Sequence, residues 1–342
     1  MKKLLLFLIS TLMLAACATA PDTASSEDEA ENRGILAAEK GYYLLDDERI
    51  VEKLDSAEYK MLINLEDYSP EILWDLMKEA AAETGVVIEE FEEPMKRNYR
   101  DIQYLDTDYG MVKNLGYILR YRFPWDVYEG PGAAANERDS KYDITIKVRD
   151  SDMNKAISVP LSVGEEFADI EKSPELEADI SPYGMKFAWA IKVKPKTKDF
   201  GPFEDLFEPT LESFSRLYPQ VLNTGLPPET VIGPVAGKTI LEEKVEPALM
   251  FLSCGTEMEV AFSTFFMDGE KLVTEASFDF DTVFDKVDEN GNEVEYKMTL
   301  EDFRQVEEFY KVILQKYNNR IDFGWSKTQF VYDTLFPDAS AE

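Results

Sequence analysis

Residues 142–149 read YDITIKVR, and polar and apolar side chains alternate through this stretch. A period of two is typical of a β-strand, in which successive side chains point to opposite faces of a sheet. One face would carry Asp143, Thr145, Lys147 and Arg149, and the other would carry tyrosine, isoleucine and valine. The stretch therefore predicts a strand with one charged face and one apolar face.

Alternation of the same kind recurs elsewhere in the chain. Further strands are expected at residues 57–65, 117–123, 185–193, 257–266 and 271–284. Their charges sort by strand: strands in the middle of the chain carry Arg and Lys, and the last two carry Asp and Glu. A half-solvated antiparallel sheet explains any single strand, but a solvated surface usually mixes both signs.

The sorted charges favour a closed barrel whose charged faces line its interior. Most connections between the expected strands are too short for parallel crossovers. The sequence thus predicts an α+β fold: an antiparallel, tunnel-like β-barrel with a charged lumen and helices packed outside. Arg and Lys on one side of such a lumen, with Asp and Glu on the other, suit a polyanion bound together with a divalent cation.

Composition excludes several kinds of chemistry. The chain has 342 residues, 68 acidic and 36 basic, and a formal net charge of −32. This charge argues against nucleic acid as a partner, because nucleic-acid binding needs a positive field. The chain has no histidine and only two cysteines, which excludes catalytic triads and His- or Cys-ligated metal clusters. Carboxylates, Lys, Arg, hydroxyls or an oxygen-bound metal must carry any reaction.

The first residues look like an export signal. Lys2 and Lys3 precede an apolar run over residues 4–14, which leads into Leu14-Ala15-Ala16-Cys17. This tetrapeptide resembles the lipobox of bacterial lipoproteins, and an ordinary signal peptide is the alternative. The resemblance implies cleavage before Cys17, lipidation of Cys17, and an extracytoplasmic, membrane-anchored protein whose only membrane contact is its N-terminal lipid.

Three segments follow from this reading. We expect a signal peptide at 1–16, an acidic tether at 17–53, and a barrel domain at 54–342 with insertions near 150–182 and 198–237. The acidic stretch at 162–180 is expected to be irregular.

A family resemblance rests on motifs in a fixed order. They are QYLDT at 103–107, LRYR at 119–122, ITIKVR at 144–149, FDFD at 278–281 and SKT at 326–328. The ordered set resembles the CYTH, or triphosphate tunnel metalloenzyme, superfamily over residues 58–336, most densely over 100–149. The resemblance implies a barrel-like tunnel that binds a triphosphate or polyphosphate with Mg²⁺ or Mn²⁺.

Site residues are carried over position by position. The resemblance implies phosphate binding by Lys60, Arg100, Arg120, Arg122, Lys147, Arg149 and Lys327. It implies metal binding by Glu58, Asp279 and Asp281. Strand parity alone adds Glu257 and Glu259 as further metal ligands.

One departure from the family pattern leaves two functions possible. Ser56 stands where the family has a metal-binding Glu, and the loss of a carboxylate should weaken binding of a hard cation. The chain is then either a lipid-anchored phosphohydrolase or a non-catalytic surface lipoprotein that keeps the fold as a scaffold or ligand binder. A salt-adapted surface protein without a phosphate site is a third interpretation.

Overall fold

The computed structural model describes residues 44–124, 142–170, 172–195, 208–287, 291–322, 324 and 326–336. The expected signal peptide, Cys17 and most of the expected tether lie outside these ranges. Within them, no helix is long and apolar enough to cross a membrane.

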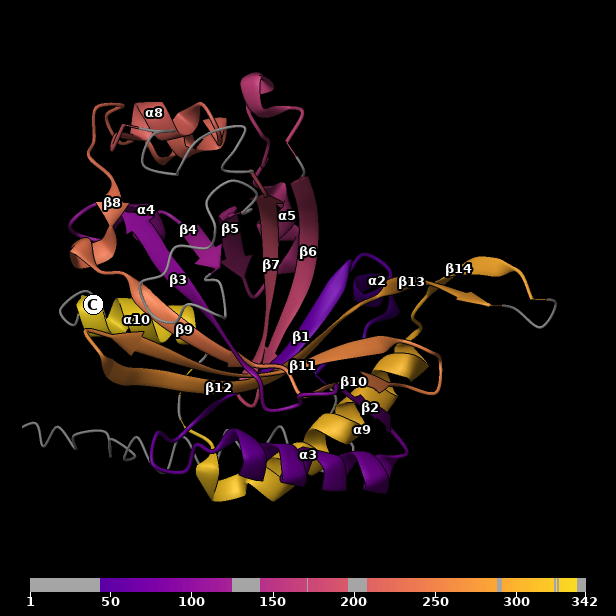
Figure 1. Ribbon diagram of the computed structural model, residues 1–342. Helices are drawn as coiled ribbons and strands as arrows, with labels where there is room; N and C mark the ends of the chain where they lie inside the picture. The colour runs from indigo at the N-terminus through magenta and orange to yellow at the C-terminus, as the bar shows by residue number, and fades with distance from the viewer. Residues whose placement is uncertain are drawn as a thin grey trace, which may run out of the picture.

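Nine strands close into a barrel (Figure 1). Around the ring they are β12 (Glu270–Asp281), β1 (Ser56–Ile63), β6 (Lys172–Ser181), β7 (Gly184–Val193), β5 (Asp143–Asp150), β4 (Tyr117–Pro124), β3 (Arg97–Asp106), β9 (Ile240–Val245) and β11 (Glu257–Met267). Pairing of β11 with β12 completes the ring. The predicted α+β barrel with outer helices is therefore confirmed.

The barrel is mixed, not purely antiparallel as expected. Eight of its neighbouring pairs are antiparallel, and β1 runs parallel to β6 with Ser56 opposite Glu177. The reason is geometric: strand directions cannot alternate all the way around a ring with an odd number of members. At least one parallel pair is required, and it falls where the first strand meets the middle of the chain.

Two stretches differ from the sequence expectation. The acidic segment at 162–180 is not irregular throughout, because its second half belongs to β6. At the N-terminal side, Leu45 and Val51 are buried in the core, and α2 (Glu48–Val51) packs there too. The packed domain therefore begins before residue 54.

Two helices cover the apolar outside of β1, β11 and β12. These are α3 (Pro70–Thr84) and α9 (Leu300–Tyr317). Ser69 caps α3 by accepting the Ile72 amide, and Gly85 ends the helix at φ 75°, where a side chain would be strained. Thr299 and Asp302 form a capping box at the start of α9.

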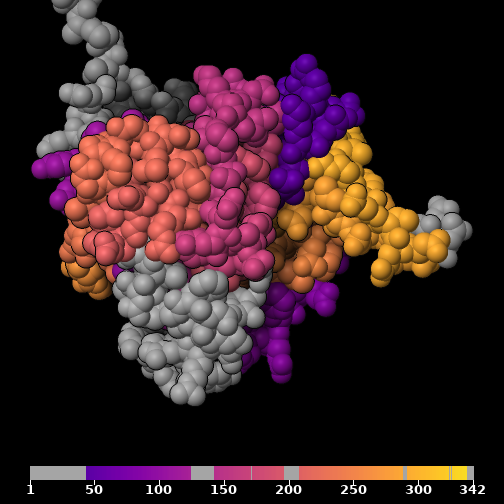
Figure 2. All heavy atoms as spheres, turned by 90° about the horizontal axis from the view of Figure 1, so that it is seen from above, coloured from indigo at the N-terminus to yellow at the C-terminus, as the bar shows by residue number. Residues whose placement is uncertain are grey.

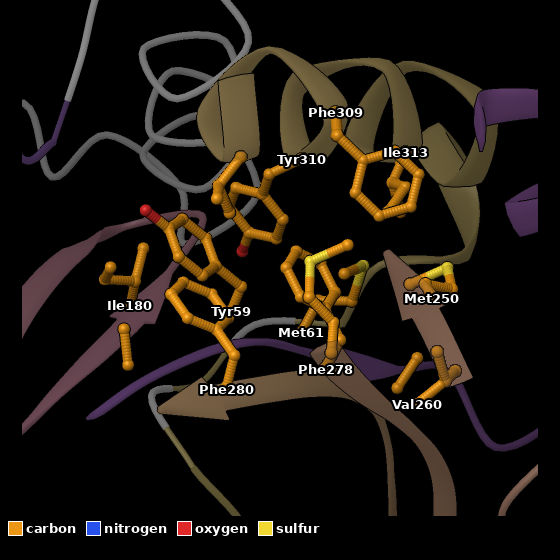
Figure 3. Packing of buried hydrophobic residues seen from close by; sticks show 14 of the residues in the cluster. Tyr59, Met61, Ile180, Met250, Val260, Phe278, Phe280, Phe309, Tyr310 and Ile313 are labelled. Carbon is orange, nitrogen blue, oxygen red and sulfur yellow. The ribbon is translucent and has the colours of Figure 1, made fainter. Parts of the chain in front are cut away.

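The centre of this core is aromatic (Figure 3). Tyr59 stacks on Phe278 with ring centroids 5.3 Å apart, and Phe309 and Tyr310 of α9 pack over them. Tyr310 also donates a 2.9 Å hydrogen bond to the Lys60 carbonyl. Since side chains alternate along β1, packing of Tyr59 outside sends Lys60 into the lumen.

A second layer covers the outside of β4, β5 and β7. It comprises α8 (Leu211–Ser215) and η2 (Pro219–Thr224), with Tyr121 and Ile146 buried beneath it. Tyr218 donates from its hydroxyl to the carbonyls of Ile144 and Ile191, at 2.7 and 3.1 Å. These bonds hold η2 against the outer face of β5 and β7, the strands whose inner face carries basic side chains.

One end of the barrel is closed by α10 (Lys327–Leu335), whose Val331 and Tyr332 pack against Leu62, Ile102 and Phe265. The remaining elements lie outside the ring: α4 (Met111–Asn114), α5 (Met153–Ser158), η1 (Glu165–Phe167), η3 (Val235–Gly237), η4 (Asn318–Arg320), β2 (Val87–Glu90), β8 (Gly233–Pro234), β10 (Ala248–Phe251), β13 (Val283–Val287) and β14 (Glu293–Lys297). The β13–β14 hairpin protrudes from the body (Figure 2).

We expect Phe278→Ala to destabilise the fold strongly. Phe278 is fully buried between the barrel and α9, so its truncation should lower the free energy of unfolding by about 3–5 kcal/mol. Val287→Ala is the control, because Val287 is 66% exposed on the hairpin and should change stability by less than about 0.5 kcal/mol. Urea unfolding measures both, and equal effects would contradict this account of the core.

Candidate functional site

The barrel lumen holds a cavity of about 290 Å³. Its acidic wall comes from β12, β1 and β6, and its basic wall comes from β3, β4, β5 and β7. Charged residues lining it are Glu58, Lys60, Arg100, Arg120, Arg122, Lys147, Arg149, Glu175, Glu177, Lys192, Glu242, Lys244, Glu275, Asp279 and Lys327. Opposite charges thus line one cavity.

A cluster of carboxylates forms at the parallel junction of β1 and β6. Glu58 lies opposite Asp179 on β6 and opposite Asp279 on β12. Carboxylate oxygens of Glu58, Glu177 and Asp179 all lie within 4.8 Å of one another. Hard divalent cations such as Mg²⁺ take oxygen ligands of this kind, so the donor set fits such a metal.

Basic side chains already compensate part of this cluster. Lys60 is paired with both Glu58 and Asp179, while Arg149 Nε lies 2.6 Å from Asp179. Burial opposes ionisation of Asp179, but Arg149 and Lys60 hold its pKa well below the usual range. Burial outweighs the 2.9 Å ion pair with Lys147 at Glu177 and raises the pKa of Glu177 to about 7.

The two arginines that β4 contributes to the basic wall are compensated much less. Arg120 and Arg122 have buried Nε atoms without a hydrogen-bond partner in the described part of the chain. Burial, together with the charges of Arg100 and Arg120, lowers the pKa of Arg122 to about 9. A buried guanidinium is stable only when paired, and Arg binds phosphate oxygens in a planar, bidentate manner. This wall can receive an anion.

Ion pairs connect α10 to charged residues of the lumen. Lys327, the first residue of α10, lies 3.2 Å from Glu242 and 2.9 Å from Glu275. Glu242 is completely buried and also accepts from Arg100. Both cations hold the pKa of Glu242 well below the usual range, against the effect of burial. The helix that closes the barrel is therefore fixed by ion pairs inside it.

The structure brings most residues named from the sequence together. All seven proposed phosphate ligands line the cavity: Lys60, Arg100, Arg120, Arg122, Lys147, Arg149 and Lys327. Glu58 and Asp279, named as metal ligands, line it as well. Their binding roles remain a prediction.

Three other proposed metal ligands do not join the cluster. Asp281 and Glu257 are exposed, Asp281 as the last residue of β12 and Glu257 as the first residue of β11. Glu259 is also exposed and lines a separate groove of about 420 Å³ beside β2 and β10. Strand parity is the correct criterion for a shared face, but it carries no information on depth along the barrel.

Glu177 and Asp179 were missed by sequence reasoning, because their segment was expected to be irregular. The signal was present: Glu175, Glu177 and Asp179 alternate with leucine, alanine and isoleucine. This is the same period of two that identified the other strands.

The departure at Ser56 has a structural counterpart. Ser56 donates a hydrogen bond from its hydroxyl to Glu175, and its backbone lies opposite Glu177. A carboxylate absent from β1 is thus present on the neighbouring strand. Ser56 alone therefore does not argue against metal binding.

No family model and no curated protein matches the chain. Some solved structures resemble it at low identity. An adenylyl cyclase candidate from Hippeastrum, described as having a dominant triphosphatase activity, is 13% identical with a TM-score of 0.34 over 66% of this chain and 78% of the other. An adenylate cyclase candidate from Bacillus halodurans is 11% identical with a TM-score of 0.32, over 81% and 98%.

A protein from Pyrococcus horikoshii is 10% identical with a TM-score of 0.35, over 82% of this chain and 99% of the other. TM-scores at this level carry no argument about the chain.

The acidic wall predicts how stability depends on pH. Burial, with a contribution from Glu58, raises the pKa of Asp279 from 3.8 to about 7. Between these values the folded protein keeps a proton that the unfolded chain has released, so the free energy of unfolding falls as pH rises through this window.

We expect Asp279→Asn, measured by urea unfolding in EDTA, to lose less stability than the wild type between about pH 4.5 and about pH 7.5. Asp268→Asn is the control, because it removes a carboxylate from an exposed turn. A wild-type pH dependence that Asp279→Asn leaves unchanged would show that Asp279 ionises normally in the folded state.

Proposed function

We propose that this chain is a distant CYTH-like protein whose barrel binds a triphosphate or polyphosphate with a divalent cation and hydrolyses it. The single observation that carries the proposal is that Arg120 and Arg122, whose buried Nε atoms have no hydrogen-bond partner among the described residues, line one cavity together with carboxylates of β1 and β6. A polyanion neutralises the arginines of the basic wall. A cation bound to the oxygens of the polyanion neutralises the carboxylates of the acidic wall.

The residues suit phosphoryl transfer, in which positioning and charge stabilisation supply most of the catalysis. Arg120 and Arg122 bind and orient the phosphate chain. Glu58, Glu177 and Asp179 would hold Mg²⁺ or Mn²⁺, which supplies Lewis-acid polarisation of a phosphoryl oxygen. Lys60 and Arg149 neutralise charge next to these carboxylates.

We also propose that the protein is an extracytoplasmic lipoprotein anchored through Cys17. The support is the order of charged residues, apolar run and Leu14-Ala15-Ala16-Cys17 at the start of the chain. Because ATP is scarce outside the cytoplasm, inorganic triphosphate, polyphosphate or another phosphorylated small molecule is the better substrate. The net charge of −32 leaves nucleic acid out of the proposal.

The enzymatic proposal predicts release of phosphate from inorganic triphosphate in the presence of Mg²⁺ or Mn²⁺, and none in EDTA. Triphosphate at a hundredfold excess over Kd should stabilise the fold by about 2.7 kcal/mol, seen as a rise in Tm. Arg120→Ala combined with Lys147→Ala should abolish both effects.

Lys238→Ala is the control, since it removes one charge from an exposed ion pair with Asp268. A rise in Tm without release of phosphate would favour the non-catalytic binder. Absence of both effects in the wild type would refute the proposed function.

The anchor is tested separately. We expect Cys17→Ser to be recovered in the soluble fraction of the producing bacterium, whereas the wild type sediments with membranes, because acyl chains on the cysteine supply the attachment. Ser10→Ala, within the apolar run, is the control. If Cys17→Ser remains processed and bound to membranes, lipidation at Cys17 is wrong.

A further inference from the structure

A row of polar side chains crosses the basic wall from strand to strand. Backbone pairing places Tyr104 opposite Arg120, Arg120 opposite Thr145, Thr145 opposite Lys192, and Lys192 opposite Ser173. All of them line the cavity. Neighbouring strands lie about 4.8 Å apart, so Arg120, Thr145 and Lys192 occupy adjacent positions on one continuous surface.

The cations of this row, like Arg122 next to it on β4, are less compensated than most cations of the lumen. Lys60, Lys147, Arg149, Arg100 and Lys327 all form ion pairs with carboxylates inside the barrel. Among the described residues, Arg120 and Lys192 form none. The charges of Asp143 and Glu175 act on Lys192, but neither carboxylate pairs with it.

Thr145 adds an independent observation. Its side chain is deeply buried, since only 4% of the residue is exposed, and its hydroxyl has no hydrogen-bond partner in the described residues. A buried hydroxyl without a partner costs about 1–3 kcal/mol. This hydroxyl lies between two cations that form no ion pair in the described residues and lines the cavity, so an anion bound there would supply an acceptor for its proton.

We propose that Thr145 and Lys192, together with Arg120, form a phosphate subsite that binds a phosphoryl group without any metal. The inference rests on the proposed function and deepens it, because it divides the cavity into two parts. One phosphoryl group of the substrate is held by the uncompensated row on β4, β5 and β7. The remainder reaches the carboxylates of β1 and β6, where the cation binds.

The cavity is divided because an incoming anion competes with carboxylates for some of the cations but not for others. An anion at Lys147 or Arg149 competes with Glu177 or Asp179, which already form ion pairs with those cations. An anion at Arg120 and Lys192 displaces no carboxylate and satisfies the Thr145 hydroxyl. The first phosphoryl group therefore binds at the row, and this binding does not require the metal.

The experiment is a calorimetric titration of the full chain with inorganic triphosphate, once in EDTA and once with Mg²⁺. The variants are Lys192→Met, which keeps the aliphatic length, and Thr145→Val, which keeps the shape. Lys155→Met, on the exposed face of α5, is the matched control for charge. Near-ultraviolet circular dichroism verifies that each variant is folded, and Lys192→Gln replaces Lys192→Met if that variant is not.

We expect wild type and Lys155→Met to bind triphosphate in EDTA. Lys192→Met should weaken this binding about tenfold, as expected for one charge-assisted hydrogen bond, and Thr145→Val should weaken it less. Binding by the wild type only with Mg²⁺ would overturn the subsite and leave the proposed function intact. Equal affinity of Lys192→Met and wild type in EDTA would also overturn it. No binding in either condition would refute the proposed function and the subsite together.

Discussion

Closure of an odd-numbered ring is the constraint on which the site depends. With nine strands, one neighbouring pair must be parallel, and in this chain the pair is β1 and β6. Parallel pairing sets the register that places Glu58 beside Asp179 and Ser56 beside Glu177. The carboxylate cluster is therefore a consequence of how the barrel closes, and β6 supplies two of its three members.

Burial of so many charges is tolerable only because they are arranged in complementary walls. Removing an ion from water costs several kcal/mol unless a partner compensates it. Lys60, Arg149 and Asp179 compensate one another on the acidic side, and Arg100 and Lys327 compensate Glu242 near α10. The basic row around Arg120 has no such partners among the described residues, and this asymmetry distinguishes a binding surface from a structural ion network.

Much of the lumen could be predicted from periodicity. Side chains that alternate in a strand face one way, so alternation alone identifies the basic faces of residues 117–123 and 142–149. Caps are equally local: Ser69, Gly85, Thr299 and Asp302 occupy the positions that their residue types favour. The position of a residue along the barrel axis is not local, because it depends on the pairing register. For this reason Glu257, Glu259 and Asp281 were assigned to the correct type of strand but lie exposed, away from the carboxylate cluster.

Ser56 stands where the sequence motif has a carboxylate, and it shows that a motif alone does not define a metal site. A motif is tied to one strand, but a cation responds to oxygen atoms in space, whichever strand carries them. Ser56 lies opposite Glu177 and donates a hydrogen bond to Glu175, so its hydroxyl holds one β6 carboxylate beside β1. Two of the three carboxylates that lie close enough to share a cation, Glu177 and Asp179, come from β6. A missing motif residue therefore weighs against metal binding only if no neighbouring strand replaces its carboxylate.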